Sequence, residues 1–181
     1  MRSFPVVPAC AFGAAVLLGG CAGAPTPTAP SVPDNLRPPA GQAVFLEALA
    51  VGVQIYECAP KADQPAVYEW VFRAPEATLA DRSGRSLGKH YAGPTWESSD
   101  GSSVVGEVKA RDPGPNASAI PWLLLAAKST AGSGVFSATR SVQRVQTVGG
   151  TAPKDACGSA NAKQIARVPY TASYYFYRTA P

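Results

Sequence analysis

The residue types best suited to chemistry lie close together in one segment, LGKHYAGPTWESSDGSSVVG, residues 87–106. It holds the only histidine of the chain, one of three tryptophans, a tyrosine and two carboxylates: His90, Tyr91, Trp96, Glu97 and Asp100. Aromatic rings give a ligand a stacking surface, and the polar groups orient it by hydrogen bonds. Because the ordinary pKa of histidine is about 6.5, His90 is also the group expected to change charge near neutral pH.

Three interpretations of this segment remain open. The five side chains form a ligand site, or Glu97 or Asp100 works with His90 as an acid–base pair in a hydrolase or lyase. In the third interpretation the domain is a structural one: Asp100 caps a turn, Trp96 is a core anchor and His90 is a satisfied hydrogen-bond partner. Gly93-Pro94 and Asp100-Gly101 are turn signals, so we expect the segment to lie in loops on a rigid scaffold.

Known enzyme and cofactor patterns are absent from the sequence. There is no phosphate-binding Gly-rich loop, no dinucleotide fingerprint and no Gly-x-Ser-x-Gly elbow. One histidine with carboxylates is not a typical zinc or copper ligand set, although oxygen ligands around Asp100 leave calcium open. We therefore assign no catalytic residue, no metal and no cofactor, and an enzyme is the less favoured class.

The scaffold that must position these residues has the pattern of short β-strands. We expect strands at residues 43–50, 52–58, 66–73, 102–111, 119–128, 134–148 and 167–178. No window of a dozen residues carries a helical period, and only Glu76–Ala80, after Pro75, is a candidate for a helical turn. The pattern predicts an all-β antiparallel sandwich or barrel with at most short helices.

The N-terminal region resembles the export signal of a bacterial lipoprotein. Arg2 precedes an apolar run, and Leu18-Gly19-Gly20-Cys21 is similar to the processing box in which the cysteine is acylated. The resemblance implies a signal peptide over residues 1–20 and a lipid anchor at Cys21. Residues 21–40, rich in Pro, Ala and Thr, predict an extended tether before a domain of residues 41–181. Ala22 after the cysteine favours an outer-membrane address over an inner-membrane one.

The four cysteines have distinct expected fates. Cys10 lies in the predicted signal peptide and Cys21 is the expected acylation site, which leaves Cys58 and Cys157 as one pair. In an oxidising compartment outside the cytoplasm, such a pair is expected to form a disulfide.

Composition sets limits on the partners. The net charge is +4, only 15% of residues are charged, and the basic residues are scattered rather than clustered. We expect no nucleic-acid partner, because such proteins carry a basic stripe or patch. The expected contacts are the membrane, through the lipid, and a small-molecule, glycan or protein ligand.

Several sequence blocks carry a family resemblance. They are GVQIYEC, YEWVFRAPEATLAD, GKHYAGPTWESSDGSSVVG, AIPWLLL, QRVQTVGGTAP and VPYTASYYFY. Together they resemble a family of secreted bacterial and fungal proteins known as a domain of unknown function, over residues 41–178. The resemblance implies an extracytoplasmic domain with two cysteines and brings no activity with it. Some fungal members carry a dehydrogenase label, which the missing nucleotide fingerprint does not support.

Overall fold

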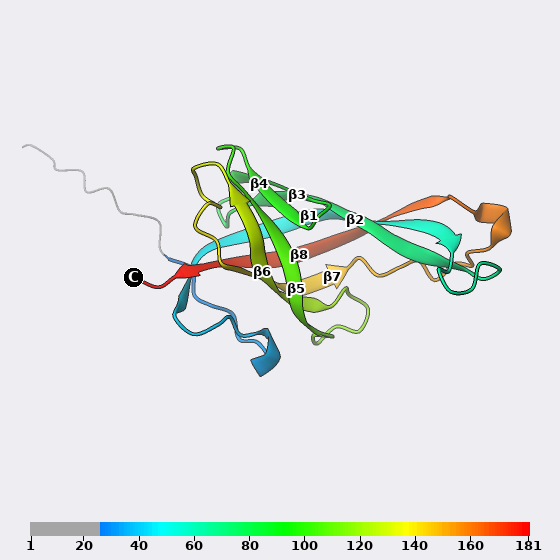
Figure 1. Cartoon of the computed structure of the whole chain (residues 1–181), viewed down its shortest axis with the longest axis horizontal. Coiled ribbons are helices and arrows are strands. Elements are labelled where there is room, and N and C mark those ends of the chain that lie inside the picture. Colours follow the sequence, from blue (N-terminus) through cyan, green and yellow to red (C-terminus); the bar gives the residue numbers. More distant parts are fainter. Residues whose placement is uncertain (1–25) are drawn as a thin grey trace, which may run out of the picture.

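The computed structural model describes residues 26–181, and its fold is a closed barrel of eight antiparallel strands (Figure 1). The strands pair in sequence order, and β8 closes the ring on β1. They are β1 (Gln42–Pro60), β2 (Tyr68–Ala80), β3 (Ser86–Tyr91), β4 (Thr95–Ser98), β5 (Ser103–Asp112), β6 (Trp122–Ala131), β7 (Ser141–Gly149) and β8 (Ile165–Thr179). The helical elements of residues 26–181 are two 3₁₀ turns, η1 (Asp34–Leu36) and η2 (Ser159–Asn161). The predicted all-β class is confirmed, as a barrel.

Some expected elements differ from the observed ones. Glu76–Ala80 is not a helical turn but part of β2, where it pairs with β1 on one side and β3 on the other. Residues 134–140 precede β7 as turns instead of forming part of it. The two strands expected around Gly52 are one continuous strand, β1. A Cβ on Gly52 would lie 2.1 Å from the Glu76 carbonyl oxygen of β2, and glycine permits that close approach.

The segment expected to form loops contains a β-hairpin instead. β3 and β4 pair with His90 opposite Trp96 and Tyr91 opposite Thr95, around a turn at residues 92–94. Successive side chains of a strand point to opposite faces of the sheet. The hairpin therefore divides the chemically interesting side chains between the inside and the outside of the barrel.

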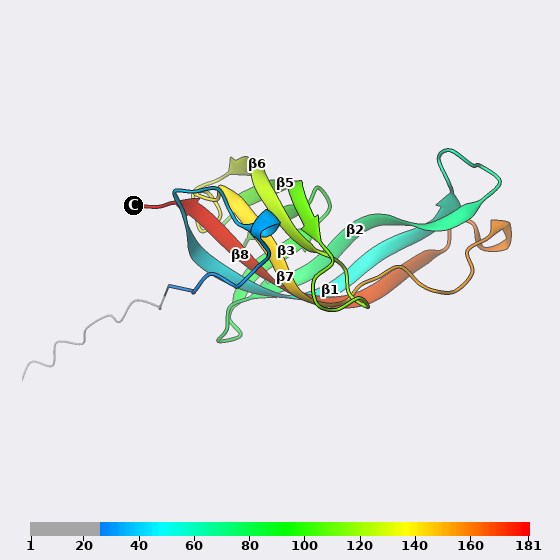
Figure 2. The same ribbon diagram turned by 90° about the horizontal axis from the view of Figure 1, so that it is seen from below.

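Three strands extend beyond the barrel and form an arm (Figures 1 and 2). The arm consists of residues 55–60 of β1, between residues 68–74 of β2 and residues 165–167 of β8. Cys58 and Cys157 form the expected disulfide near its tip. The segment that follows β7 is fixed to the arm, because the Tyr56 hydroxyl donates to the Gly150 carbonyl at 2.7 Å and Trp70 Nε1 to the Asp155 carbonyl at 3.0 Å.

Large side chains fill the interior of the barrel. A Cβ on Gly106 would lie 2.9 Å from the Trp96 ring, so the glycine makes room for the indole. Edge-to-face contacts join Trp96 to Tyr174 and Phe176 of β8. The other large, fully buried apolar side chains of this cluster are Phe136, Leu79, Leu125, Val104 and Val142.

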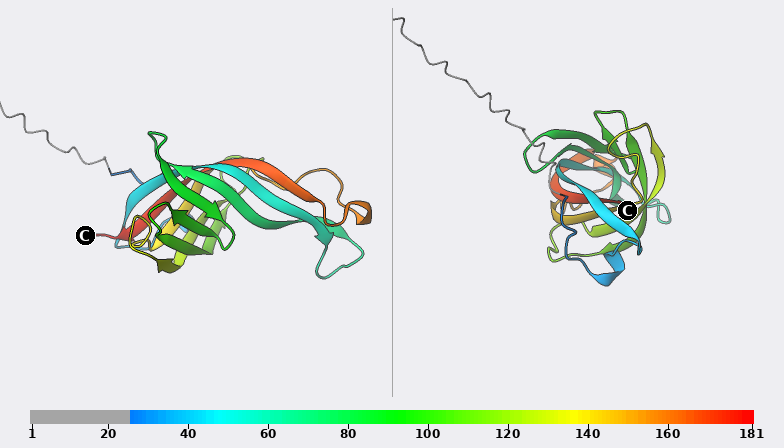
Figure 3. Two further views of the ribbon diagram at one scale, coloured as in Figure 1. Left: turned by 90° about the horizontal axis from the view of Figure 1, so that it is seen from above. Right: turned by 90° about the vertical axis from the view of Figure 1, so that its left-hand side faces the viewer.

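The described part of the predicted tether, residues 26–40, lies against the outside of the barrel (Figure 3). Leu36 of η1 is fully buried, and its carbonyl accepts a hydrogen bond of 2.6 Å from Gln143 Nε2 of β7. Val32 packs against Tyr175 and Tyr177. The predicted signal peptide and Cys21 lie outside the described residues. Among the helices of residues 26–181, none is long and apolar enough to cross a membrane.

Removal of the disulfide is expected to destabilise the domain. The two cysteines are 99 residues apart in the sequence, and a cross-link over a loop of this length restricts the unfolded chain strongly. The double variant Cys58→Ser/Cys157→Ser should lose about 2–5 kcal/mol of unfolding free energy, measured by urea denaturation. Reduced wild-type protein is the matched control and should unfold at the midpoint of the variant. A midpoint equal to that of the oxidised protein would contradict the expectation.

Candidate functional site

His90 and Trp96 lie inside the barrel, from neighbouring positions of β3 and β4. Their rings stack with centroids 4.5 Å apart and planes 14° from parallel, and His90 is 3% exposed. Nδ1 of His90 lies 2.8 Å from the Thr95 carbonyl oxygen, so this nitrogen carries the proton and donates it. Burial, and to a smaller extent the charge of Arg144, lowers the pKa of His90 to about 3, although the hydrogen bond to Thr95 opposes the shift. His90 is therefore neutral at physiological pH, with Nε2 as an acceptor.

Tyr91 and Glu97 lie on the outer face of the same hairpin. The Tyr91 hydroxyl donates to Glu97 Oε2 at 2.6 Å, and Lys89 Nζ lies 3.1 Å from Oε1. These two contacts, first the tyrosine and then the lysine, hold the pKa of Glu97 below its usual range. Lys89, Tyr91 and Glu97 therefore satisfy one another's charges and hydrogen bonds on the surface.

Asp100 has the role of a turn residue. Its Oδ1 accepts hydrogen bonds from the Ser102 amide at 2.8 Å and hydroxyl at 2.6 Å, and its Oδ2 accepts one of 2.8 Å from the Val135 amide. These bonds, the Ser102 hydroxyl first, lower the pKa of Asp100 to about 2. The carboxylate joins the β4–β5 turn to the loop before β7. Its oxygens are occupied by protein donors rather than arranged around a calcium ion.

The five side chains singled out from the sequence thus occupy three places. His90 and Trp96 lie inside the barrel, Tyr91 and Glu97 are hydrogen-bonded on its outer face, and the hairpin separates His90 from Glu97 across the sheet. The geometry gives no support to acid–base catalysis by His90 with Glu97 or Asp100. Ligand binding by any of the five remains a prediction.

The structure brings four further residues to His90 and Trp96: Tyr170 and Tyr174 of β8, Arg144 of β7 and Gln54 of β1. We call these six residues the polar cluster. The ring of Tyr174 lies 5.0 Å from that of His90, and its hydroxyl is 3.4 Å from the Tyr170 hydroxyl. Arg144 pairs with Tyr174 in register, so both side chains point inward. Burial raises the pKa of both tyrosines, and the charge of Arg144 opposes that rise.

Two donors of the polar cluster are unsatisfied. Gln54 is 2% exposed and Trp96 1% exposed, yet Trp96 Nε1 has no hydrogen-bond partner, and Gln54 Nε2 makes no hydrogen bond of good geometry although it acts on the neighbouring Tyr170 hydroxyl. A buried polar group without a partner costs about 1–3 kcal/mol, so such groups are rare in native proteins. The barrel interior therefore retains unused hydrogen-bonding capacity next to His90 and Tyr170.

Residues 113–121, between β5 and β6, form a cap over the end of the barrel where the polar cluster lies. The Ile120 amide donates to the Gly149 carbonyl at 2.9 Å, and the Thr147 hydroxyl to the Ile120 carbonyl at 2.6 Å. Arg144 donates to the Pro121 carbonyl oxygen from Nε at 3.1 Å and from Nη2 at 2.8 Å. Pro121, the last residue of the cap, is thus held by the guanidinium of Arg144.

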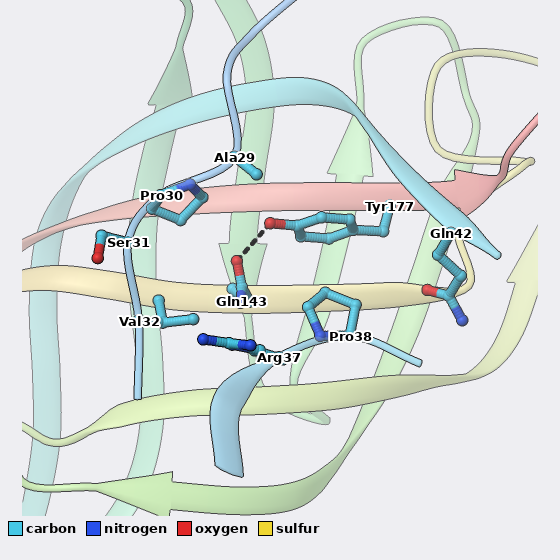
Figure 4. Close-up of a pocket in the computed structure, with 9 residues that line it drawn as sticks. All are labelled: Ala29, Pro30, Ser31, Val32, Arg37, Pro38, Gln42, Gln143 and Tyr177. Carbon is cyan, nitrogen blue, oxygen red and sulfur yellow. Dashed lines mark hydrogen bonds between the residues drawn. The ribbon is translucent and has the colours of Figure 1, made fainter. Parts of the chain in front are cut away.

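Two hollows lie elsewhere on the surface. One, of about 380 Å³, separates residues 29–42 from the barrel wall (Figure 4). Gln143 in its wall is paired, since it accepts a bond from the Tyr177 hydroxyl and donates to Leu36, whereas the buried Oε1 of Gln42 has no hydrogen-bond partner. The other, of about 520 Å³, lies at the arm tip beside Cys58. Within residues 26–181, no three His, Cys, Asp or Glu side chains converge as a metal site.

Sequence reasoning missed four members of the polar cluster. Tyr170 and Tyr174 share a face of β8 by simple alternation, but nothing in the sequence marks that face as a site. Arg144 is one of the scattered basic residues, and it stands two positions after the inward-facing Val142. A charged residue at an inward strand position is the signal that was available.

The fold and the polar cluster define a single β-barrel domain with an apolar core and a capped, donor-rich end. The chain belongs to the family described as "Protein of unknown function (DUF3455)", whose model matches residues 39–178. The match begins and ends within three residues of the first and last strands, and it confirms the resemblance seen in the sequence. No curated protein and no solved structure matches the chain.

The low pKa of His90 predicts a specific pH dependence. In the unfolded chain the pKa of His90 is about 6.5, so the unfolded chain binds a proton more readily than the folded one. The free energy of unfolding should therefore fall as the pH drops from about 6.5 towards 3. The slope should reach about 1.4 kcal/mol per pH unit, and His90→Gln should remove it between pH 6.5 and 5, above the range where carboxylates titrate. Urea denaturation across this range measures both. As His90 is the only histidine, one imidazole NMR signal is decisive, and a midpoint near pH 6.5 would disprove burial of a neutral ring.

Proposed function

We propose that this protein is a lipid-anchored domain of the cell envelope that binds a small molecule at the capped end of its barrel. The unsatisfied donors of Gln54 and Trp96, buried in the polar cluster, carry the ligand part of the proposal. Eight-stranded barrels are just wide enough to be filled by side chains or to hold one small ligand. Here the polar cluster lies inside the barrel beside the cap, among the apolar side chains of the core.

The anchor part of the proposal rests on the N-terminal sequence. A box similar to that of lipoproteins ends at Cys21, and a segment rich in proline follows it. The disulfide supports an oxidising compartment outside the cytoplasm, because such bonds are rare in the reducing cytosol. The outer membrane is the preferred address.

A second candidate is a glycan or a protein bound on the outer face of the β3–β4 hairpin. The observation that favours it is the trio of Lys89, Tyr91 and Glu97, whose polar groups are already oriented by mutual hydrogen bonds. Such a site does not involve the polar cluster, so single hydroxyl deletions distinguish the two.

Lipidation at Cys21 is tested by metabolic labelling with a fatty-acid analogue. The wild-type protein should be labelled and should partition with membranes, whereas Cys21→Ser should be neither labelled nor membrane-bound. Cys10→Ser is the matched control and should behave as the wild type. Equal labelling of Cys21→Ser and the wild type would disprove the anchor.

Ligand binding is tested by native mass spectrometry of the purified protein, followed by a thermal-shift screen of small molecules. For any compound that binds, Tyr174→Phe should weaken the affinity about tenfold, the effect of one buried hydrogen bond. Tyr91→Phe removes the same hydroxyl from the outer face and should leave the affinity unchanged. Loss of binding in Tyr91→Phe alone would move the site to the hairpin surface. A screen without any Tyr174-dependent ligand would count against the proposed function.

A further inference from the structure

Arg144 is the one charged member of the polar cluster, and no carboxylate compensates it. The eight ion pairs formed within residues 26–181 all use other cations. Its register partner inside the barrel is Tyr174, and the charge of Arg144 also acts on the pKa values of the neutral His90 and of the hydroxyls of Tyr56 and Tyr170. A partly buried cation without a counter-ion favours the approach of an anion.

The remaining polar groups of the polar cluster fit the same kind of ligand. Arg144, Gln54 Nε2 and Trp96 Nε1 are all donors, and each tyrosine adds a hydroxyl that can donate. The neutral imidazole of His90 offers one acceptor. A site composed mainly of donors is complementary to a group that only accepts, such as a carboxylate or a phosphate.

The guanidinium already binds an oxygen through the edge that an oxyanion uses. Nε and Nη2 of Arg144 converge on the single carbonyl oxygen of Pro121, at 3.1 and 2.8 Å. This edge of arginine binds carboxylates and phosphates through two parallel hydrogen bonds. A carbonyl oxygen carries only part of a negative charge, so an anion gains more from the same edge. Arg144 is half-buried and keeps contact with solvent.

We propose that the capped end of the barrel is an oxyanion site, in which Arg144 binds a carboxylate or phosphate group that displaces the Pro121 carbonyl. The cap shifts as the anion enters, and the unsatisfied donors of the polar cluster contact the anion or the body of its bearer. This inference rests on the proposed function and names the chemical class of its ligand. Free inorganic anions and small organic acids share this chemistry.

The test uses acetate, phosphate and sulfate as probes at constant ionic strength, with chloride as the balancing ion. One of these anions should raise the melting temperature of the wild type and shift the signal of its single histidine. Arg144→Gln should bind that anion at least tenfold more weakly, since the positive charge and the paired N–H donors of the guanidinium are lost. Arg111→Gln is the matched control, because Arg111 is exposed, forms no ion pair within the described residues and carries the same charge. A preference for acetate points to organic acids, and one for phosphate or sulfate points to inorganic oxyanions or their esters.

Arg144→Lys keeps the cation and guards against a folding defect in Arg144→Gln. It should remain folded and bind the probe more weakly than the wild type, because an ammonium lacks the two-pronged edge. Wild-type affinity in Arg144→Lys, or equal thermal shifts in wild type and Arg144→Gln, would overturn the oxyanion site. A neutral ligand that depends on Tyr174, with no anion depending on Arg144, would overturn the oxyanion site but leave the proposed function standing. If neither a Tyr174-dependent ligand nor an Arg144-dependent anion binds, both the oxyanion site and the proposed function are disproved.

Discussion

Closure of the sheet into a ring is the constraint on which the rest of the structure depends. Once β8 pairs with β1, successive strand positions face the interior and the outside in turn, except at the bulges that shift the register, such as the one between Ile55 and Tyr56 of β1. A shift of one residue in β4 would exchange Trp96 with Glu97 and place a carboxylate in the core. Gly106 and Gly52 mark the places where ring closure brings an indole or another strand too close for any side chain.

The fold class was predictable from the sequence because its signals are local. Alternating β-branched and aromatic residues with frequent Gly and Pro indicate strands without reference to anything distant. The choice between sandwich and barrel was not predictable, since it depends on the pairing of β1 with β8, whose partners lie more than 100 residues apart. The loops assigned around His90 and Trp96 were wrong because four-residue strands such as β4 are too short to show a period.

The candidate site shows the same division between local and distant information. Proximity in the sequence grouped His90, Tyr91, Trp96, Glu97 and Asp100, but a hairpin separates neighbours as readily as it joins them. The contacts of His90 across the barrel come from β7 and β8, more than 50 residues further along the chain. Such contacts follow from the register of the closed sheet, which no single segment encodes.

The attachment of Leu36 to the barrel wall sets the length of chain that lies between Cys21 and the folded domain. Fifteen residues separate Cys21 from Leu36, and a chain of that length spans at most about 50 Å when fully extended. The arm tip lies at the opposite end of the molecule from the first described residues (Figure 1). If Cys21 carries the proposed lipid, this span would hold the barrel close to its membrane, and the disulfide-linked tip would be the part best placed to contact components farther from the membrane.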